Sequence, residues 1–133
     1  MTDAAYEAET GGVIVRVRPR YIPEQSDPAL RRWVWAYQIE IVNLSSEVLT
    51  LRERHWIITD AVARTEEVKG PGVVGEEPTL HPGQSYTYVS GCPLSTPSGS
   101  MVGAYRMERG DGSSLQVKIP AFSLDGPEPR VLN

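Results

Sequence analysis

A chain of 133 residues with 40% hydrophobic and 23% charged residues has the size and composition of one ordinary globular domain. Its 13 basic and 17 acidic side chains give a net charge of −4, which favours solubility and argues against general nucleic-acid binding. The longest apolar run, Trp33 to Tyr37, has five residues, whereas a membrane-spanning helix needs about 20.

The N-terminal segment and the cysteine content indicate a cytoplasmic protein. Residues 1–12, MTDAAYEAETGG, are acidic and lack the basic start and apolar centre of a signal peptide. Cys92 is the only cysteine, so an internal disulfide cannot form. The fold is therefore expected to rest on its hydrophobic core alone.

Apolar residues recur with a period of two, which predicts β-strands. The 11 prolines and 12 glycines interrupt every stretch that would carry three turns of an amphipathic helix. In the first expected strand, 12–19, valines alternate with arginines, which indicates one buried and one basic face. In the second, 32–44, the aromatic residues and isoleucines share one face, as is typical of a long half-buried strand.

Five further strands follow, and an Arg-Gly-Asp-Gly turn between the last two favours a hairpin. The segment 48–59 is interpreted either as one strand broken near residues 52–54 or as two shorter strands. The expected bounds of all seven strands are 12–19, 32–44, 48–59, 64–70, 85–90, 101–109 and 114–120. The residues expected in the core are Trp33, Trp35, Tyr37, Ile39, Val15, Val17, Val117 and Ile119.

Seven short strands separated by turn signals predict an all-β fold, an antiparallel sandwich of the immunoglobulin or fibronectin type III kind. Because the cysteine pair of antibody domains is absent, the fibronectin-like version fits better. A single domain over 1–133 is expected, with its core between about residue 12 and residue 124 and with mobile termini. An edge strand of such a sandwich can pair across a dimer.

Four segments of the chain stand out as motifs. They are RHWIITD at 54–60, GPGVVGE at 70–76, SGCPL at 90–94 with TPSGSM at 96–101, and IPAF at 119–122. Together they resemble the ApaG family. The segments occur in the family's order, and the similarity extends from about Val13 to Leu124. The resemblance implies a fibronectin-type sandwich, found as a free-standing bacterial protein and as a domain of larger eukaryotic proteins. These include an F-box ubiquitin-ligase adaptor and a polymerase-associated protein, so reuse as an appended module implies binding.

The resemblance brings biological associations but no settled activity. Bacterial members of the family are linked to cobalt resistance and magnesium efflux. Their gene often neighbours those for a diadenosine tetraphosphate hydrolase and a ribosomal RNA dimethyladenosine methyltransferase. No catalytic residue can be transferred from the family to this chain.

Gly70, Gly72 and Gly75 match the GxGxxG pattern that lets a backbone approach a pyrophosphate in dinucleotide-binding folds. The context argues against that role here, because no amphipathic helix follows and the two carboxylates of Glu76 and Glu77 would repel a phosphate. The favoured interpretation is a structural loop that uses the positive φ angles open to glycine. The alternatives are an anion site and a protein-contact loop.

Two residues inside this loop and one before it bear on those alternatives. Lys69 would support a bound anion. Val73 and Val74 lie at the expected tip, where apolar side chains are unusual unless they pack back onto the fold or meet a partner. A contact surface or a folded clasp is therefore favoured over a phosphate cradle.

Trp56 is a candidate for partner contact together with Arg54. Trp56 shares the parity of its neighbours Arg52 and Arg54, which indicates a position on the outer face beside arginines. An exposed tryptophan among arginines is typical of interaction hot spots. The alternative is burial of Trp56 between a sheet edge and a loop.

Metal binding and catalysis find no support in the residue pattern. His55, His81 and Cys92 are separated by 26 and 11 residues and lack the short spacings of zinc sites. Cys92 precedes Pro93 in an expected loop, with no nearby histidine or acid to activate its thiol. No metal ligand, cofactor or catalytic residue is therefore expected.

Two functions remain open at this point. The leading hypothesis is a non-enzymatic binding module with a protein partner. The alternative is a binder or hydrolase of pyrophosphate or nucleotide ligands, with the glycine loop holding the phosphate. The candidate residues are Lys69, Gly70, Gly72, Val73, Val74 and Gly75 for the anion-binding or partner-binding loop, and Trp56 with Arg54 for partner contact.

Overall fold

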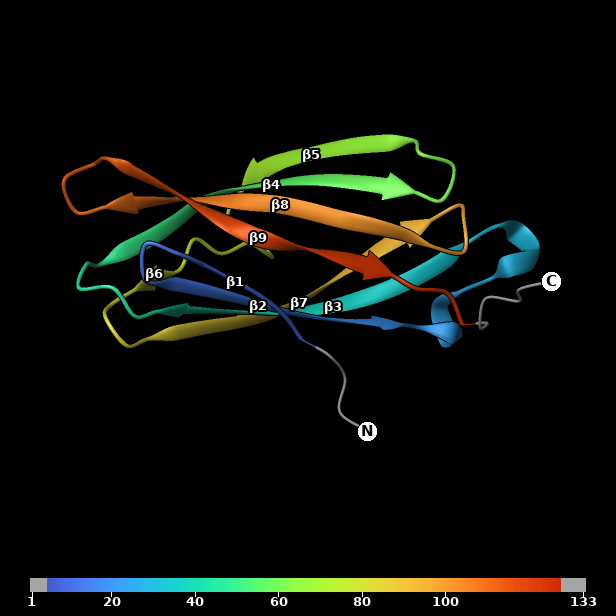
Figure 1. The fold of residues 1–133 in the computed structure, drawn as a ribbon, viewed down its shortest axis with the longest axis horizontal. Coiled ribbons are helices and arrows are strands. Elements are labelled where there is room, and N and C mark those ends of the chain that lie inside the picture. Colours follow the sequence, from blue (N-terminus) through green and yellow to red (C-terminus); the bar gives the residue numbers. More distant parts are fainter. Residues whose placement is uncertain (1–4, 128–133) are drawn as a thin grey trace.

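The structure is a computed structural model that describes residues 5–127 of the chain. In this range nine β-strands form two antiparallel sheets packed face to face (Figure 1). The strands are β1 (Tyr6–Thr10), β2 (Val13–Tyr21), β3 (Trp33–Asn43), β4 (Leu49–Asp60), β5 (Thr65–Pro71), β6 (Thr79–Leu80), β7 (Ser85–Leu94), β8 (Gly99–Arg109) and β9 (Ser114–Leu124). The predicted all-β antiparallel sandwich is confirmed.

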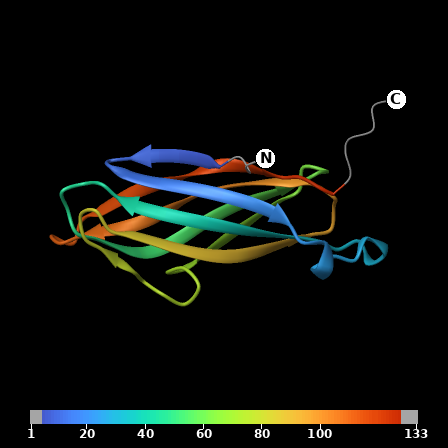
Figure 2. The same cartoon turned by 90° about the horizontal axis from the view of Figure 1, so that it is seen from below.

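The order of the strands leaves β7 and β5 as free edges. One sheet has the order β1-β2-β3-β7, and the other has the order β5-β4-β8-β9, with the short β6 also pairing with β4. On one side of the sandwich β1 and β2 approach β9, where Thr10 Oγ1 accepts a hydrogen bond of 3.2 Å from the Lys118 amide. Figure 2 shows β1 and β7 at opposite sides of the front sheet, with the loop that follows β5 projecting beside β7.

Helical structure in residues 5–127 is limited to two short 3-10 helices, η1 (Pro23–Gln25) and η2 (Pro28–Leu30), between β2 and β3. Neither helix is long or apolar enough to cross a membrane. Each begins at a proline, whose fixed φ angle suits the first helical position. Both lie at the end of the sandwich remote from the loop that follows β5 (Figure 1).

All seven predicted strands are present, with ends displaced by at most four residues. The largest differences are at the C-terminal ends of β7 and β9, which continue past Pro93 and Pro120. Proline is tolerated at both places, because each strand is a sheet edge and Pro120 also lies where the register of β8 and β9 shifts.

Two strands were not predicted, β1 and β6. β1 lies in the segment that was expected to be mobile, where it pairs with β2, and Tyr6 packs against Phe122 at a centroid distance of 6.1 Å. At the other terminus the carbonyl of Asp125 accepts a 2.7 Å hydrogen bond from the Trp35 indole. Residues 1–4 and 128–133, which were also expected to be mobile, lie outside the described residues.

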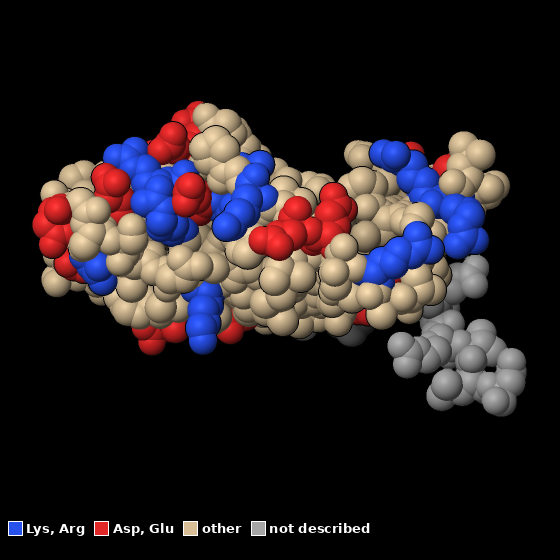
Figure 3. Space-filling view, turned by 90° about the horizontal axis from the view of Figure 1, so that it is seen from above, with Lys and Arg blue, Asp and Glu red and all other residues tan. Residues whose placement is uncertain are grey.

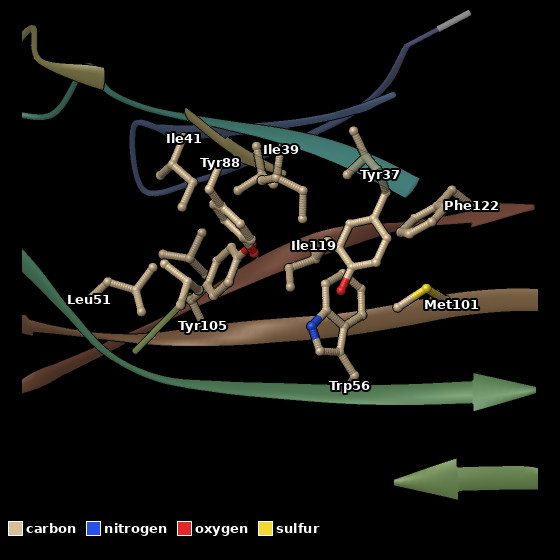
Figure 4. Close-up of a cluster of buried hydrophobic side chains, with 14 of the residues drawn as sticks. Tyr37, Ile39, Ile41, Leu51, Trp56, Tyr88, Met101, Tyr105, Ile119 and Phe122 are labelled. Carbon is tan, nitrogen blue, oxygen red and sulfur yellow. The ribbon is translucent and has the colours of Figure 1, made fainter. Parts of the chain in front are cut away.

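The core lies between the two sheets and draws on both of them (Figure 4). Of the predicted core residues, Trp33 is only half-buried, because it stands at the first position of β3 and packs against the core from its edge. The other predicted core residues are buried: Trp35, Tyr37, Ile39, Val15, Val17, Val117 and Ile119.

A β-bulge in β4 decides which side chains of this strand face the core. Leu51 and Glu53 pair with neighbouring residues of β8, which leaves Arg52 without a partner in that strand. An extra residue reverses the alternation of side chains beyond it. Trp56 therefore faces the core, with 3% of its surface exposed. The interpretation that placed Trp56 on the outer face is wrong, and its alternative, burial, is correct.

Candidate binding groove between two free sheet edges

A groove with a volume of about 360 Å³ opens between the edges of the two sheets. Its walls come from β4, β5 and the loop after β5 on one side and from β7 on the other. Its floor includes the buried side chains of Tyr37, Trp56 and Met101. We call this space the edge groove.

Three alternate cross-strand pairs of β4 and β5 form one wall of the edge groove. The pairs are Arg54 with Gly70, Trp56 with Val68, and Ile58 with Glu66. Every member that has a side chain lines the groove. The wall therefore carries a guanidinium at one end, apolar and aromatic groups in the middle, and a carboxylate at the other end.

Arg54 is held in place by the loop that follows β5. Its Nη1 donates hydrogen bonds of 2.9 Å to the Pro71 carbonyl and 3.0 Å to the Gly72 carbonyl. Gly70 allows this approach, since a Cβ atom there would lie 3.0 Å from Arg54 Nη2. The guanidinium is thus fixed at the wall while its remaining N–H groups stay available to a ligand.

Trp56 contributes a hydrogen-bond donor to the floor. Its ring packs edge-on against Tyr37 and Phe122, at centroid distances of 5.5 and 5.9 Å. Every fully buried side-chain N or O atom of residues 5–127 has a hydrogen-bond partner. The Trp56 indole N–H has none in this range, so it must reach the space of the groove. Figure 4 shows the Tyr37 hydroxyl pointing toward the Trp56 ring.

The hydroxyl groups around the groove are neutral at physiological pH. Burial raises the pKa of Tyr37, and the side chain of Ser90 offsets part of this effect. Burial also raises the pKa of Tyr88, whose hydroxyl is hydrogen-bonded to that of Tyr105. These groups can donate or accept hydrogen bonds but carry no charge.

Cys92 lies in the wall formed by β7 and is 4% exposed. Burial, and to a lesser degree the Glu66 carboxylate, raise the pKa of its thiol to about 11. Because the thiolate is the reactive form, this cysteine is a poor nucleophile at neutral pH.

The chain after β5 folds into a tight two-residue turn. Val73 and Glu76 exchange backbone hydrogen bonds of 2.8 and 2.9 Å, and the two residues between them, Val74 and Gly75, have φ angles of 44° and 82°. Two consecutive positive φ angles define a type I′ turn. Val73 is completely buried, whereas Val74 is 55% exposed at the mouth of the edge groove.

The amides that a phosphate cradle would need are already used in this turn. The Gly72 amide donates to the Arg52 carbonyl at 2.8 Å, and the Val73 amide donates to the Glu76 carbonyl. Gly72 has a φ angle of 59°, and a Cβ atom there would collide with the Glu76 carbonyl oxygen. The glycine spacing thus serves the turn, with Val73 anchoring it in the core.

The remaining predicted residues are dispersed. Lys69 lies beside His55 in the β4–β5 register, outside the edge groove, and lines a separate shallow depression. His81 lies between β6 and β7, and Cys92 lies in the groove. Within residues 5–127 no three His, Cys, Asp or Glu side chains come close enough together to hold a metal ion.

Many charges outside the edge groove are paired. The ion pairs of β4 join Arg52 with Glu77 and Glu108, Glu53 with Arg106, His55 with Glu67, and Asp60 with Arg64. Figure 3, which looks onto the side of the molecule that carries β5, shows basic and acidic side chains close together. The two charged residues that line the edge groove, Arg54 and Glu66, form no ion pair within residues 5–127. The same is true of several charged residues outside it, such as Arg18 and Lys69.

The sequence missed the part of the groove that β7 supplies. Ser90 and Tyr88 were not candidates, because their proximity to Arg54 depends on the packing of two sheets. A weak signal existed in the alternation of Tyr88, Ser90 and Cys92, which places these residues on one face of a strand. That alternation extends the predicted strand to the length observed for β7.

Comparison with known proteins gives consistent results from sequence and structure. The model of the ApaG domain matches residues 23–109. Protein ApaG of Paramagnetospirillum magneticum is 54% identical over 125 residues, which cover 94% of this chain and 96% of the relative. Protein ApaG of Brucella anthropi is 57% identical, with the same coverage.

A solved structure is also similar. The crystal structure of a putative ApaA protein from Bordetella pertussis superposes with a TM-score of 0.84 at 46% sequence identity. The match covers 88% of this chain and 95% of that protein. Since the family match spans well over half of the sequence and the relatives align along nearly all of it, the chain belongs to the ApaG family.

Proposed function

We propose that this chain is a non-enzymatic binding module that acts in the cytoplasm as a single domain and recognises a partner protein. The contact surface consists of the Val74 turn and the adjoining mouth of the edge groove. The observation that carries the proposal is the conformation of Val74. A β-branched side chain is held at a φ angle of 44°, and 55% of its surface is exposed.

The left-handed region is costly for valine, at roughly 1–2 kcal/mol, and strained residues tend to occur at functional sites. Asn or Gly would fit the turn better, so the local fold gives no reason for valine at this position. An apolar side chain at the mouth of a groove is explained by contact with a partner.

The chemistry of the groove supports binding over catalysis. The Cys92 thiol has a raised pKa, and the hydroxyl groups nearby have no activating base. The pyrophosphate alternative is disfavoured, because the amides of Gly72 and Val73 are engaged in backbone hydrogen bonds. We further propose that the link of the family to cobalt and magnesium operates through the partner protein.

The test is capture of partners from an extract of the source cells by immobilised protein, with quantitative mass spectrometry. Val74→Asn relieves the backbone strain but removes the apolar contact, so it should reduce the specific captured partners severalfold. Val62 provides a matched control, because it is also an exposed valine, at 59%, but lies in the turn between β4 and β5. Val62→Asn should leave capture unchanged. Equal capture by wild type and Val74→Asn would count against the proposal.

A further inference from the structure

The two unpaired charges of the edge groove lie at its opposite ends. Arg54 and Ile58 are four residues apart on β4, and Ile58 pairs with Glu66 of β5. At the rise of a β-strand, the two cross-strand pairs are separated by about 13 Å. A single amino acid is too short to place its ammonium and carboxylate groups at both ends. In an extended peptide, residues four positions apart lie on the same face with this spacing.

The edge of β7 is suited to accept such a peptide. None of its ten residues, Ser85–Leu94, is charged. Natural edge strands commonly carry charges that prevent pairing, as Glu66, Glu67 and Lys69 do on β5. Since Pro93 has no N–H group, pairing with an added strand would end before it. The segment from Ser85 to Cys92 therefore provides a backbone template for β-strand addition.

The floor of the groove specifies the residue between the two charges. The Trp56 indole N–H has no acceptor within residues 5–127 and reaches the groove beside the Tyr37 hydroxyl. A ligand that fills the groove would cover this N–H, and a covered donor without a partner costs about 1–3 kcal/mol. An uncharged side chain with an acceptor atom, such as glutamine, would satisfy it.

The course of β7 sets the order of the charges in the peptide. The Tyr88 hydroxyl is hydrogen-bonded to that of Tyr105, which is the β8 partner of Arg54. Further along β7, Pro93 and Leu94 line a hollow together with Glu66. β7 thus runs from the guanidinium end of the groove to the carboxylate end. Antiparallel pairs outnumber parallel ones about two- to threefold. A strand added antiparallel to β7 meets Glu66 first and Arg54 last.

We infer that the edge groove binds an extended segment of the partner protein, which pairs antiparallel with β7. This segment carries a basic residue first, a residue with a hydrogen-bond acceptor two positions later, and an acidic residue two positions after that. The basic side chain pairs with Glu66, the central side chain accepts from Trp56, and the acidic side chain pairs with Arg54. This inference rests on the proposed function and names its partner chemistry.

The probe is a peptide with blocked ends, Thr-Lys-Thr-Gln-Thr-Glu-Thr, titrated to millimolar concentration into isotope-labelled protein and followed by NMR. The indole N–H signal of Trp56, assigned with Trp56→Phe, should shift together with the amides of β7. The same peptide with lysine and glutamate exchanged should bind about tenfold more weakly, because both ion pairs become repulsive.

Glu66→Lys tests the charge pattern without disturbing the buried side of the fold, because Glu66 is exposed. This variant should bind the lysine-containing peptide about fivefold more weakly and should prefer a peptide with glutamate at both charged positions. Unchanged affinity in Glu66→Lys, or equal affinity for the two charge orders, would overturn the inference. Signal changes that depend on protein concentration without peptide would overturn it too, since a second copy would then occupy the groove.

The capture experiment separates this inference from the proposed function. If the peptide fails to shift Trp56 while Val74→Asn still reduces capture, the inference is wrong and the binding module stands. If neither effect is seen, both are wrong.

Discussion

The guanidinium of Arg54 lies against Gly70, at a place where a Cβ atom would come within 3.0 Å of Nη2. Gly72, two residues later, instead has the backbone carbonyl of Glu76 in the place of its missing side chain. The two glycines thus have different roles. One makes room for a flexible side chain, and the other is required by the backbone of the turn.

Substitution of these two glycines should separate the roles. Gly70→Ala should lower the free energy of unfolding by less than about 1 kcal/mol, because the Arg54 side chain can move aside. Gly72→Ala should lower it by about 2 kcal/mol or more, because a left-handed φ angle of 59° and a backbone collision cannot both be relieved. Urea denaturation of the three proteins measures the difference. Equal losses would contradict the assignment of separate roles.

Val74→Asn should stabilise the isolated protein. Asparagine tolerates the left-handed region far better than valine, so the free energy of unfolding should rise by roughly 0.5–1 kcal/mol. Val62→Asn is the control, since Val62 has no positive φ angle and should gain nothing. Thermal unfolding of both variants and wild type would reveal the gain. A loss of stability in Val74→Asn would mean that the valine side chain itself supports the turn.

Sequence periodicity predicted most of the sandwich because the sheets bury one face of each strand. The segment 32–44 was recognised from strict alternation and appears as β3, Trp33–Asn43. β1 was missed because Tyr6–Thr10 is only half-buried along one face and is mostly polar. A break near residues 52–54 was expected, but its form, a bulge with one extra residue at Arg52, was not, because it depends on pairing with β8. That single residue reversed the expected orientation of Trp56.

The candidate site was predictable only in part, for a similar physical reason. Local sequence indicated the turn around Val74 and drew attention to Arg54. It also suggested a phosphate loop, since a glycine spacing does not reveal whether the amides of Gly72 and Val73 are already hydrogen-bonded. The groove itself depends on two sheet edges that meet only in the folded state, so Tyr88 and Ser90 of β7 were not recognised.

Nucleotide binding by the turn can be tested directly. Because the Gly72 and Val73 amides donate to the Arg52 and Glu76 carbonyls, calorimetry with pyrophosphate, nucleoside triphosphates and diadenosine polyphosphates should give only heats of dilution. The measurement should include magnesium ions, which accompany these ligands in cells. Binding that is lost in Gly72→Val, at a temperature where that variant remains folded, would restore the alternative function.

The buried thiol of Cys92 should make the stability of the protein depend on pH in the alkaline range. Its pKa is raised from 9.0 to about 11, mainly by burial, so the protonated thiol is favoured in the folded state. The associated stabilisation is complete below pH 9 and is lost as the pH rises through 11. A shift of this size corresponds to about 2–3 kcal/mol.

Cys92→Ala isolates this contribution from that of the buried tyrosines, whose pKa values are also raised and which remain in both proteins. The variant leaves a small cavity, a cost that does not change with pH. The difference in the free energy of unfolding between wild type and Cys92→Ala should therefore be constant below pH 9 and fall by about 2–3 kcal/mol by pH 11. The rate of reaction of the thiol with a soluble disulfide should remain low at neutral pH and rise over the same range. A rapid reaction at neutral pH would show that Cys92 is an activated thiol and would reopen the question of catalysis in the edge groove.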